Sequence, residues 1–385
     1  MDTKIILGIA VAAVIVGIAI VVVSQNPLSD TTYGISEPIS QTNKVGLVIN
    51  TVNAPKTIED IEHSYQLAST SGIGRTNLYI HWNQFEPEEG VFNWKTTDIL
   101  MSLNNKYNLK TTLFFSVVNA DRLGPFPHWM GNQAMGKTRE GHTIRVLDEI
   151  LTRYSNNIDY VIFAGDIDYH FQRAPATIPD YKEFFNNISN KIKENHPQVK
   201  IGNSLSLENV INKDLVRGGA FELIPQLEMG DFVAFSYKPT DIIGDIARTP
   251  DKTPSGKQSI WPAIDDFEKT LDMFTETKIA FFDISWSTSG FVNGNKEAQK
   301  IFVDSSFNFF KENESEIEFF TWSRLIDKPT GTCVSKNIEV VGGSEFDSNQ
   351  FRLERIDAYM CNSGFLDTNE NAKPAWTQFK KQILG

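Results

Sequence analysis

Three aspartates in this sequence stand where apolar runs end. Asp166 and Asp168 follow such a run in the stretch VIFAGDIDYHF, and Asp283 lies near the end of another, KIAFFDIS. Carboxyl groups serve as general acids, general bases and nucleophiles. If the fold gathers the ends of these runs in one place, the aspartates can act on one substrate.

Eight apolar runs of this kind alternate with amphipathic segments from Val45 onward. The strands we expect begin at Val45, Thr76, Lys110, Tyr160, Val199, Phe232, Lys278 and Ile317. Segments between them, such as PDYKEFFNNISNKIKENH, carry apolar residues at helical spacings. The runs are continuous rather than alternating, which is typical of strands covered on both faces. The pattern predicts an α/β protein with a (β/α)8 TIM barrel, and a doubly wound open sheet is the structural alternative.

In such a barrel the chemistry lies at the C-terminal ends of the strands. The residues at these ends are Asn50, Trp82, Asn83, Asn119, Asp121, Asp166, Asp168, Ser206, Tyr237, Asp283, Trp286, Trp322 and Arg324. They are carboxylates, amides and aromatic residues, and aromatic faces pack well on the C–H faces of sugars. His81, His128 and His170 lack the spacing of a metal site, so we expect no metal and no cofactor.

In order and spacing, these motifs resemble those of the clan A glycoside hydrolases, which are TIM-barrel enzymes. The phrase NLYIHWNQFEPEEGVFNW is similar to the second-strand region of that family, and AGDIDY falls on its fourth-strand Gly-Asn-Glu phrase. DISW matches the end of the seventh strand, Tyr237 a tyrosine on the sixth, and Trp322 a tryptophan on the eighth. The closing GFLDTNENAKPAW is also similar, so the resemblance spans nearly the whole body.

The resemblance implies that Asp166 is the general acid/base and Asp283 the nucleophile or base. It further implies that Tyr237 orients Asp283 and that Trp322 and Trp286 shape the sugar site. Further substrate contacts are expected from Trp82, Asp168 and Asn119. The partner implied is a carbohydrate.

Three positions depart from the family pattern. Both catalytic glutamates are aspartates here, and Gly165 replaces the asparagine that usually binds the sugar 2-hydroxyl. On an unchanged backbone the shorter side chains open the gap between the carboxyls to roughly 7 to 8 Å. The chain is thus a retaining glycosidase with a shifted backbone, a hydrolase that uses Asp283 as a base on water, or a barrel that binds glycans without cleaving them.

Several of these residues also have purely structural interpretations. Asp166 can cap the helix that follows it, and Asp168 can pair with Arg173. Trp82 and Glu86 can brace the loop after the second strand, and Trp322 can belong to the core.

The first residues predict a membrane anchor. Ile5 to Val23 is an uncharged apolar run of 19 residues, which nearly spans a bilayer core. We expect a single transmembrane helix in residues 1–23, a polar linker in 24–44, and the barrel in 45–385 on the extracytoplasmic side. A cleaved signal peptide is the alternative. On the extracytoplasmic side, Cys333 and Cys361 are expected to form a disulfide, and two unpaired core cysteines are the alternative.

Charge and motif context argue against nucleic acid and nucleotide as partners. The net charge is −12, and the 36 lysines and arginines are scattered along the chain. Gly131 to Thr138 matches the P-loop pattern, but the prolines of GPFPHWM before it do not suit the buried strand that a P-loop requires. We interpret Asp121 to Thr138 instead as a long loop after the third strand, positioned beside the cleft.

Overall fold

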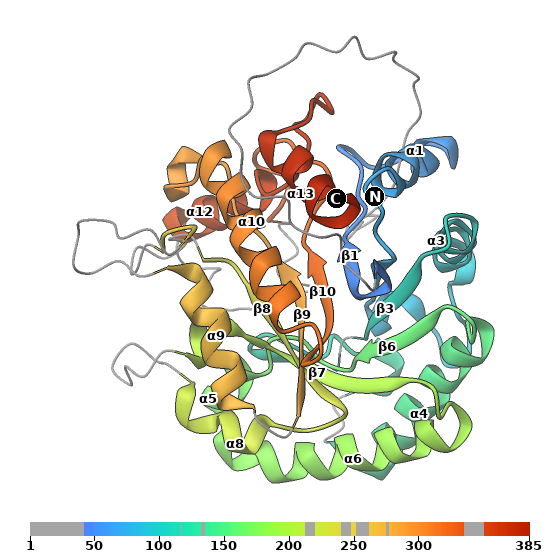
Figure 1. Ribbon diagram of the computed structural model, residues 1–385. Coiled ribbons are helices and arrows are strands. Elements are labelled where there is room, and N and C mark those ends of the chain that lie inside the picture. The colour runs from blue at the N-terminus through green and yellow to red at the C-terminus, as the bar shows by residue number, and fades with distance from the viewer. Residues whose placement is uncertain are drawn as a thin grey trace.

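Eight parallel strands close into a barrel in the computed structural model (Figure 1). It describes residues 42–115, 117–131, 135–211, 220–239, 248–251, 262–274, 277–334 and 350–385. The barrel strands are β1 (Val45–Leu47), β2 (Arg75–Ile80), β3 (Lys110–Phe115), β6 (Ile158–Ile162), β7 (Lys200–Ser206), β8 (Phe232–Tyr237), β9 (Lys278–Ile284) and β10 (Ile317–Trp322). Each pairs with its neighbours in sequence, and β1 closes the barrel on β10. All eight predicted strands, and the TIM barrel itself, are confirmed.

Helices surround the barrel (Figure 1). The longer ones are α1 (Glu59–Ser69), α3 (Trp94–Lys106), α4 (Lys137–Arg153), α6 (Ile178–Asn195), α9 (Ala263–Met273), α10 (Lys296–Glu312), α12 (Gln350–Cys361) and α13 (Pro374–Leu384). Shorter pieces are α2 (Trp82–Phe85), α5 (Asp168–Arg173), α7 (Leu207–Val210), α8 (Ile224–Leu227), η1 (Thr42–Lys44), η2 (His128–Met130), η3 (Pro175–Thr177), η5 (Phe221–Leu223) and η6 (Gly290–Val292). A small hairpin, β4 (Val118–Asn119) with β5 (Arg122–Leu123), follows β3.

The amphipathic spacing of the helices accounts for their placement. On α6 the buried residues include Tyr181, Phe184, Phe185, Ile188 and Ile192, which recur at intervals of three and four. They form one apolar stripe along the helix, which packs on the outside of the strands.

Side chains on the two faces of the strands enter two separate cores. Phe114, Phe232, Phe282 and Phe319 belong to a cluster inside the barrel, while the residues between strands and helices form the larger outer core. Because neighbouring residues of a strand point to opposite faces, only every second residue can reach the barrel interior. This alternation decides which of the predicted residues meet at the mouth of the barrel, the end at which the strands have their C-termini.

An ion pair closes the N-terminal end of the barrel. Arg75 is 1% exposed, and its guanidinium donates to both carboxylate oxygens of Asp159. The same guanidinium lies 4.6 Å from the ring centroid of Tyr160. These contacts belong to the end opposite the strand exits, so they stabilise the barrel without taking part in a site at its mouth.

The predicted anchor and most of the predicted linker lie outside the described residues. Residues 42–44 form η1, immediately before β1. Among the helices that the structure describes, none is long and apolar enough to span a membrane.

The P-loop-like segment does not follow a strand. Its first glycine, Gly131, comes directly after η2, and α4 begins at Lys137. The described residues just before Gly131 therefore do not supply the strand that a phosphate-binding loop needs.

Candidate functional site

Asp166 is turned toward the barrel interior as the chain leaves β6. Its backbone is in the left-handed region, with φ of 49°, a conformation that aspartate tolerates better than most residues. Its Oδ1 accepts hydrogen bonds from the Ser204 hydroxyl at 3.2 Å and the Ser236 hydroxyl at 2.8 Å. These serines come from β7 and β8. Ile167 takes the N-cap position of α5 and no side chain caps that helix, so the capping interpretation of Asp166 is wrong.

A shift in strand register brings Asp283 beside the same serine. Phe235 pairs with Phe281, but the next residue of β8, Ser236, pairs with Asp283. The extra residue, Phe282, is a bulge in β9, and bulges re-aim side chains at strand ends. Ser236 thus donates to Asp166 and is also the neighbour of Asp283 across the strand pair. The two aspartates predicted to act together are brought to one place.

Lys238 completes this cluster, and the sequence interpretation missed it. It follows β8 directly, and its Nζ lies 3.8 Å from Asp283 Oδ2. Burial lowers the pKa of Lys238, but the carboxylates of Asp283, Asp166 and Glu208 outweigh burial and hold the pKa above its ordinary value. The ammonium group is therefore charged at neutral pH. The signal was present in FSYKP, because Lys238 is two residues after Ser236 and shares its face of the strand.

A second cation, Arg324, interacts electrostatically with Asp283 from beyond β10. Burial lowers the pKa of Arg324 and the charge of Asp283 opposes that effect. Its guanidinium donates to the backbone oxygen of Met360 at 2.8 Å and contacts Cys333 Sγ at 3.4 Å. Asp283 accordingly lies in the field of two cations.

Three residues of the second strand and its exit add polar groups to the mouth. The Asn77 amide donates to the Phe282 backbone oxygen at 3.0 Å and to the Tyr79 hydroxyl at 3.3 Å. Burial raises the pKa of Tyr79, and the charge of Asp283 raises it further. Burial lowers the pKa of His81 to about 4, so its imidazole is neutral at pH 7. His81 Nδ1 and Asp283 Oδ1 are buried and have no hydrogen-bond partner among the described residues.

Tyr237 lies on the other face of β8 and does not reach Asp283. It is fully buried in the outer core, and its hydroxyl donates to Asp266 Oδ2 at 2.6 Å on α9. The prediction that Tyr237 orients Asp283 is therefore wrong. The cause is strand alternation, because Ser236 and Lys238 take the inward positions on either side of it.

The predicted sugar platforms Trp322 and Trp286 also belong to the outer core. The ring of Trp322 packs at 5.6 Å from Phe302 and 5.3 Å from Phe365, and the residue is 1% exposed. Trp286 packs at 5.0 Å from Phe302, on α10. These placements contradict a sugar-stacking role, since neither ring faces the barrel interior.

Trp82 and Asp168 have structural partners. The Trp82 indole donates to the buried carboxylate of Glu86 at 2.8 Å, and Arg145 pairs with the same carboxylate. This matches the loop-bracing interpretation. Asp168 is fully buried and accepts from the Ser206 backbone at 2.8 Å and from the Asn209 amide at 2.6 Å. It does not line the mouth.

Asp168 holds a proton more tightly than an ordinary aspartate. Burial raises its pKa to about 8, and the charge of Asp166 adds to the effect. Its proposed partner Arg173 pairs instead with Asp121. Asp168 thus connects the exit of β6 to the end of β7 and to α7.

Asn119 is half-buried and lies beside the exit of β6. The backbone of its hairpin pairs with Gly165, whose N–H donates to Val118 and whose oxygen accepts from Ala120, both at 2.9 Å. Asn119 and Gly165 are bridge partners. Asn119 therefore remains a candidate for substrate contact.

A disulfide joins Cys333 and Cys361. Asp357 lies close to both sulfurs, and the three side chains form a group of metal-ligating types. With the sulfurs bonded to each other the thiolates of a metal site are lacking. The backbone N–H groups of Gly331, Cys333 and Val334 donate to Asp357 instead.

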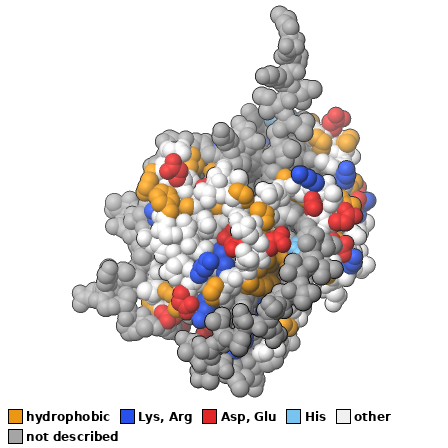
Figure 2. All heavy atoms as spheres, turned by 90° about the horizontal axis from the view of Figure 1, so that it is seen from above, with side chains coloured by type: hydrophobic (Ala, Val, Ile, Leu, Met, Phe, Trp, Pro, Cys, Tyr) orange, Lys and Arg blue, Asp and Glu red, His pale blue; other side chains and the backbone are white. Residues whose placement is uncertain are grey.

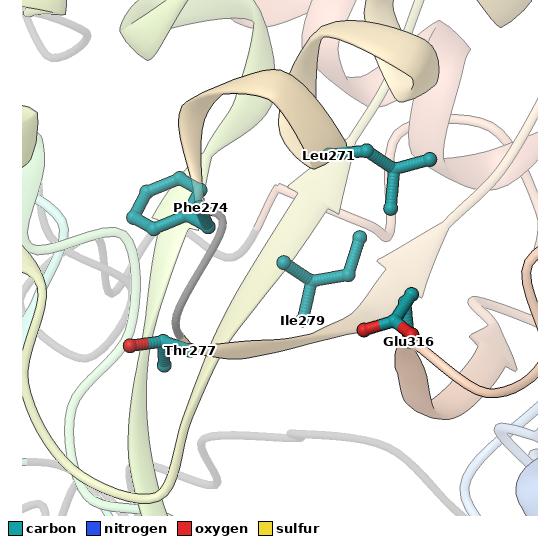
Figure 3. Close-up of a pocket in the computed structure, with 5 residues that line it drawn as sticks. All are labelled: Leu271, Phe274, Thr277, Ile279 and Glu316. Carbon is teal, nitrogen blue, oxygen red and sulfur yellow. The ribbon is translucent and has the colours of Figure 1, made fainter.

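A cavity of about 260 Å³ lies at the opposite end of the barrel (Figure 3). It is lined by Leu271, Phe274, Thr277, Ile279 and Glu316. Ile279 is near the start of β9 and Glu316 precedes β10, whereas Asp283 is near the end of β9. The cavity has both apolar and polar lining residues and is separate from the carboxylate cluster.

On the face seen from above in Figure 2, acidic, basic and apolar side chains are interspersed. Among the described residues visible there, no large area carries one sign of charge. The described residues visible on that face form no basic stripe of the kind that binds a nucleic-acid backbone.

No family model matches the sequence, and no curated protein matches it. Solved structures similar to this chain include glycoside hydrolases. One is a family 39 glycoside hydrolase from Bacteroides cellulosilyticus WH2, with a TM-score of 0.58 and 14% identity over 91% of this chain and 66% of that chain. A GH5_18 protein from Bifidobacterium longum, in complex with Manβ1-4GlcNAc, has a TM-score of 0.58 and 10% identity over 88% and 78%.

Xylanase 10B from Thermotoga maritima has a TM-score of 0.56 and 12% identity, over 89% of this chain and 95% of its own. At these identities the likeness is one of fold. The chain shares the TIM-barrel fold of these glycoside hydrolases.

Proposed function

We propose that the barrel binds a poly- or oligosaccharide and cleaves it as a glycoside hydrolase through Asp166 and Asp283. One observation carries the proposal. Ser236 donates to Asp166 and pairs across the strands with Asp283, which gathers two carboxyls at the C-terminal end of a TIM barrel. The shared fold of glycoside hydrolases adds support.

The two carboxyls have different neighbours, and this assigns their roles. Asp166 accepts from serine hydroxyls, which can rotate away while the carboxyl carries a proton, so it suits the acid/base. Asp283 lies beside Lys238 and Arg324, whose positive charges favour a carboxylate, so it suits the nucleophile or the base on water. Asn119, Tyr79 and His81 would contact the hydroxyls of the sugar.

A second candidate is a glycan-binding barrel that does not cleave. The ion pair between Lys238 and Asp283 favours it, because a cation at 3.8 Å weakens a carboxylate as a nucleophile. The outward placement of Trp322 and Tyr237 also departs from the geometry that the resemblance implies.

We also propose that residues 5–23 anchor the barrel to a membrane, with the body on the extracytoplasmic side. The uncharged apolar run supports this. If so, alkaline carbonate will leave the full chain in the membrane pellet, and external protease will degrade the body in intact cells. Release by carbonate, or protection of the body, would contradict the proposal.

The test uses the full chain, purified in mild detergent and screened on aryl glycosides, natural polysaccharides and a glycan array. Asp283→Asn and Asp166→Asn are compared with Asp272→Asn, an exposed aspartate on α9. Turnover that falls by about 10³-fold or more in the first two variants alone supports hydrolysis by the pair. Binding without turnover, unchanged in all variants, supports the glycan-binding barrel.

The configuration of the product separates the two possible roles of Asp283. A retaining enzyme forms a covalent intermediate on its nucleophile and releases a sugar with the anomeric configuration of the substrate, whereas an inverting enzyme releases the opposite anomer. Retention by the natural protein assigns Asp283 as the nucleophile, and inversion assigns it as the base on water.

A further inference from the structure

We propose that the sugar unit beside Asp166 is not held through its 2-hydroxyl group. The substrates would then be glycans whose sugar at this position carries another substituent at carbon 2, or none, with 2-acetamido sugars the class that fits best. This inference rests on the proposed function, because it takes Asp166 as the group next to the bound sugar.

Gly165 leaves no room for a side chain. A Cβ built on it would lie 2.6 Å from Cε2 and 3.1 Å from Cζ of Phe114. Phe114 is itself fixed, since its ring stacks on Phe282 at 5.9 Å with an interplanar angle of 18° and contacts Tyr79 at 5.6 Å. The ring therefore cannot turn aside to admit an amide at position 165.

The ring changes what a sugar can contact next to Asp166. Glycoside hydrolases usually bind the 2-hydroxyl through hydrogen bonds that strengthen in the transition state. Here the space of the expected amide is filled by an aromatic edge. A sugar hydroxyl against the edge of the Phe114 ring loses its hydrogen bonds to water and forms none with the protein. The methyl group of an acetamido substituent instead makes van der Waals contacts with the ring.

His81 supplies a polar group beside the ring of Phe114. Its ring lies 6.2 Å from the ring of Phe114 in an edge-on arrangement. Its Nδ1 is buried and has no partner among the described residues. A neutral imidazole can accept a hydrogen bond from the N–H of an acetamido group or donate one to its oxygen.

The experiment compares three aryl glycosides that differ only at carbon 2, bearing hydroxyl, hydrogen or acetamido, on the full chain. We expect kcat/KM for the hydrogen and acetamido compounds to equal or exceed that for the hydroxyl compound. A preference for the hydroxyl compound over the 2-deoxy compound of about 100-fold or more overturns the inference.

If the barrel binds without turnover, the same series is run as methyl glycosides, with Kd as the readout. Affinities for the 2-deoxy and 2-acetamido compounds no weaker than for the hydroxyl compound support the inference, and a hydroxyl preference of about tenfold overturns it. Failure of every compound to react or bind overturns the proposed function and this inference together. A hydroxyl preference overturns this inference alone.

Two variants identify the group responsible. Phe114→Val with Gly165→Asn restores the expected amide and the space for it. Relative to Phe114→Val alone, we expect it to increase the preference for the hydroxyl compound by about tenfold, the value of one hydrogen bond. No increase in a folded double variant counts against the role assigned to position 165.

Asn119→Ala is the second variant, because Asn119 is the bridge partner of Gly165. A hydroxyl preference in the natural protein that disappears in Asn119→Ala would show that Asn119 supplies the missing amide, which overturns the inference. If a variant does not fold, the substrate series on the natural protein still decides.

Discussion

At the scale of single residues, the Ser236 hydroxyl and the Lys238 ammonium group are the contacts that connect the two aspartates of the candidate site. Ser236 donates to Asp166 and sits across the strand pair from Asp283, and Lys238 lies next to Asp283. The charge of Lys238 offsets part of the repulsion between carboxylates that a closed barrel forces together. The sequence shows each of these residues at a strand end but does not show that they share neighbours.

Removing the charge of Lys238 should lower the rate of hydrolysis. The Lys238 ammonium lies 3.8 Å from Asp283 Oδ2 and offsets part of the repulsion between the two carboxyl groups. We expect kcat/KM to fall by about tenfold in Lys238→Met and by less in Lys238→Arg, which keeps the charge. Steady-state kinetics measures both, and an unchanged kcat/KM in Lys238→Met would show that the reaction does not need this ammonium group.

Asp168 should make the protein less stable as pH rises. Its pKa is about 8 in the folded state and near 3.8 in an unfolded chain. Between these values the unfolded state has released the proton that the folded state still holds, so the free energy of unfolding falls with rising pH. Asp168→Asn removes this dependence, on the order of a few kcal/mol between pH 5 and 8. Urea denaturation at both pH values measures the free energy of unfolding of each protein. An equal change in this free energy between pH 5 and 8 in the natural protein and in Asp168→Asn would exclude Asp168 as the cause.

At the scale of elements, the alternation of strand residues separates site from core. On β8, Phe232, Ala234 and Ser236 face the interior, and Tyr237 faces α9. Tyr79, on β2, is a tyrosine that does interact electrostatically with Asp283. The motif match at Tyr237 therefore identified a strand that contributes to the site, β8, but not the side chains of that strand that face the interior.

The two tyrosines give opposite expectations. Tyr237→Phe removes a buried hydrogen bond to Asp266 and should lower the free energy of unfolding by about 1–2 kcal/mol with less than about a twofold change in kcat/KM. Tyr79→Phe removes a hydroxyl near Asp283 and should lower kcat/KM by about tenfold with little change in stability. Thermal unfolding and steady-state kinetics measure both, and the reverse pattern would restore the role that the resemblance assigns to Tyr237.

At the scale of the whole molecule, closure of the barrel gathers residues that are far apart in the chain. Asn77 on β2 donates to Phe282 on β9, across the interior. The segment after β10 is fixed at the same end, because Arg324 contacts both Met360 and the disulfide at Cys333. The C-terminal part of the chain is thereby attached to the mouth.

The disulfide should stabilise this arrangement measurably. It closes a loop with a sequence separation of 28 residues, and loops of this length correspond to about 3–4 kcal/mol of denatured-state entropy. We expect Cys333→Ser with Cys361→Ser to lower the free energy of unfolding by about that amount in urea denaturation. Reducing agent should have the same effect on the natural protein and none on the double variant. Equal stability with and without reductant would show that the bond contributes little.

The sequence by itself determined the eight strands, their order and the class of barrel. It could do so because continuous apolar runs and amphipathic periodicity are local properties that survive without knowledge of neighbours. It also placed Asp166 and Asp283 at strand ends, which in a barrel of this kind meet at one face.

Only the tertiary structure decided which side chains point inward. The bulge at Phe282 turned Asp283 beside Ser236, and strand alternation sent Tyr237, Trp286 and Trp322 into the outer core. Lys238 became part of the site for the same reason. Register and bulges depend on contacts between strands distant in sequence, and such contacts leave no mark within any one strand.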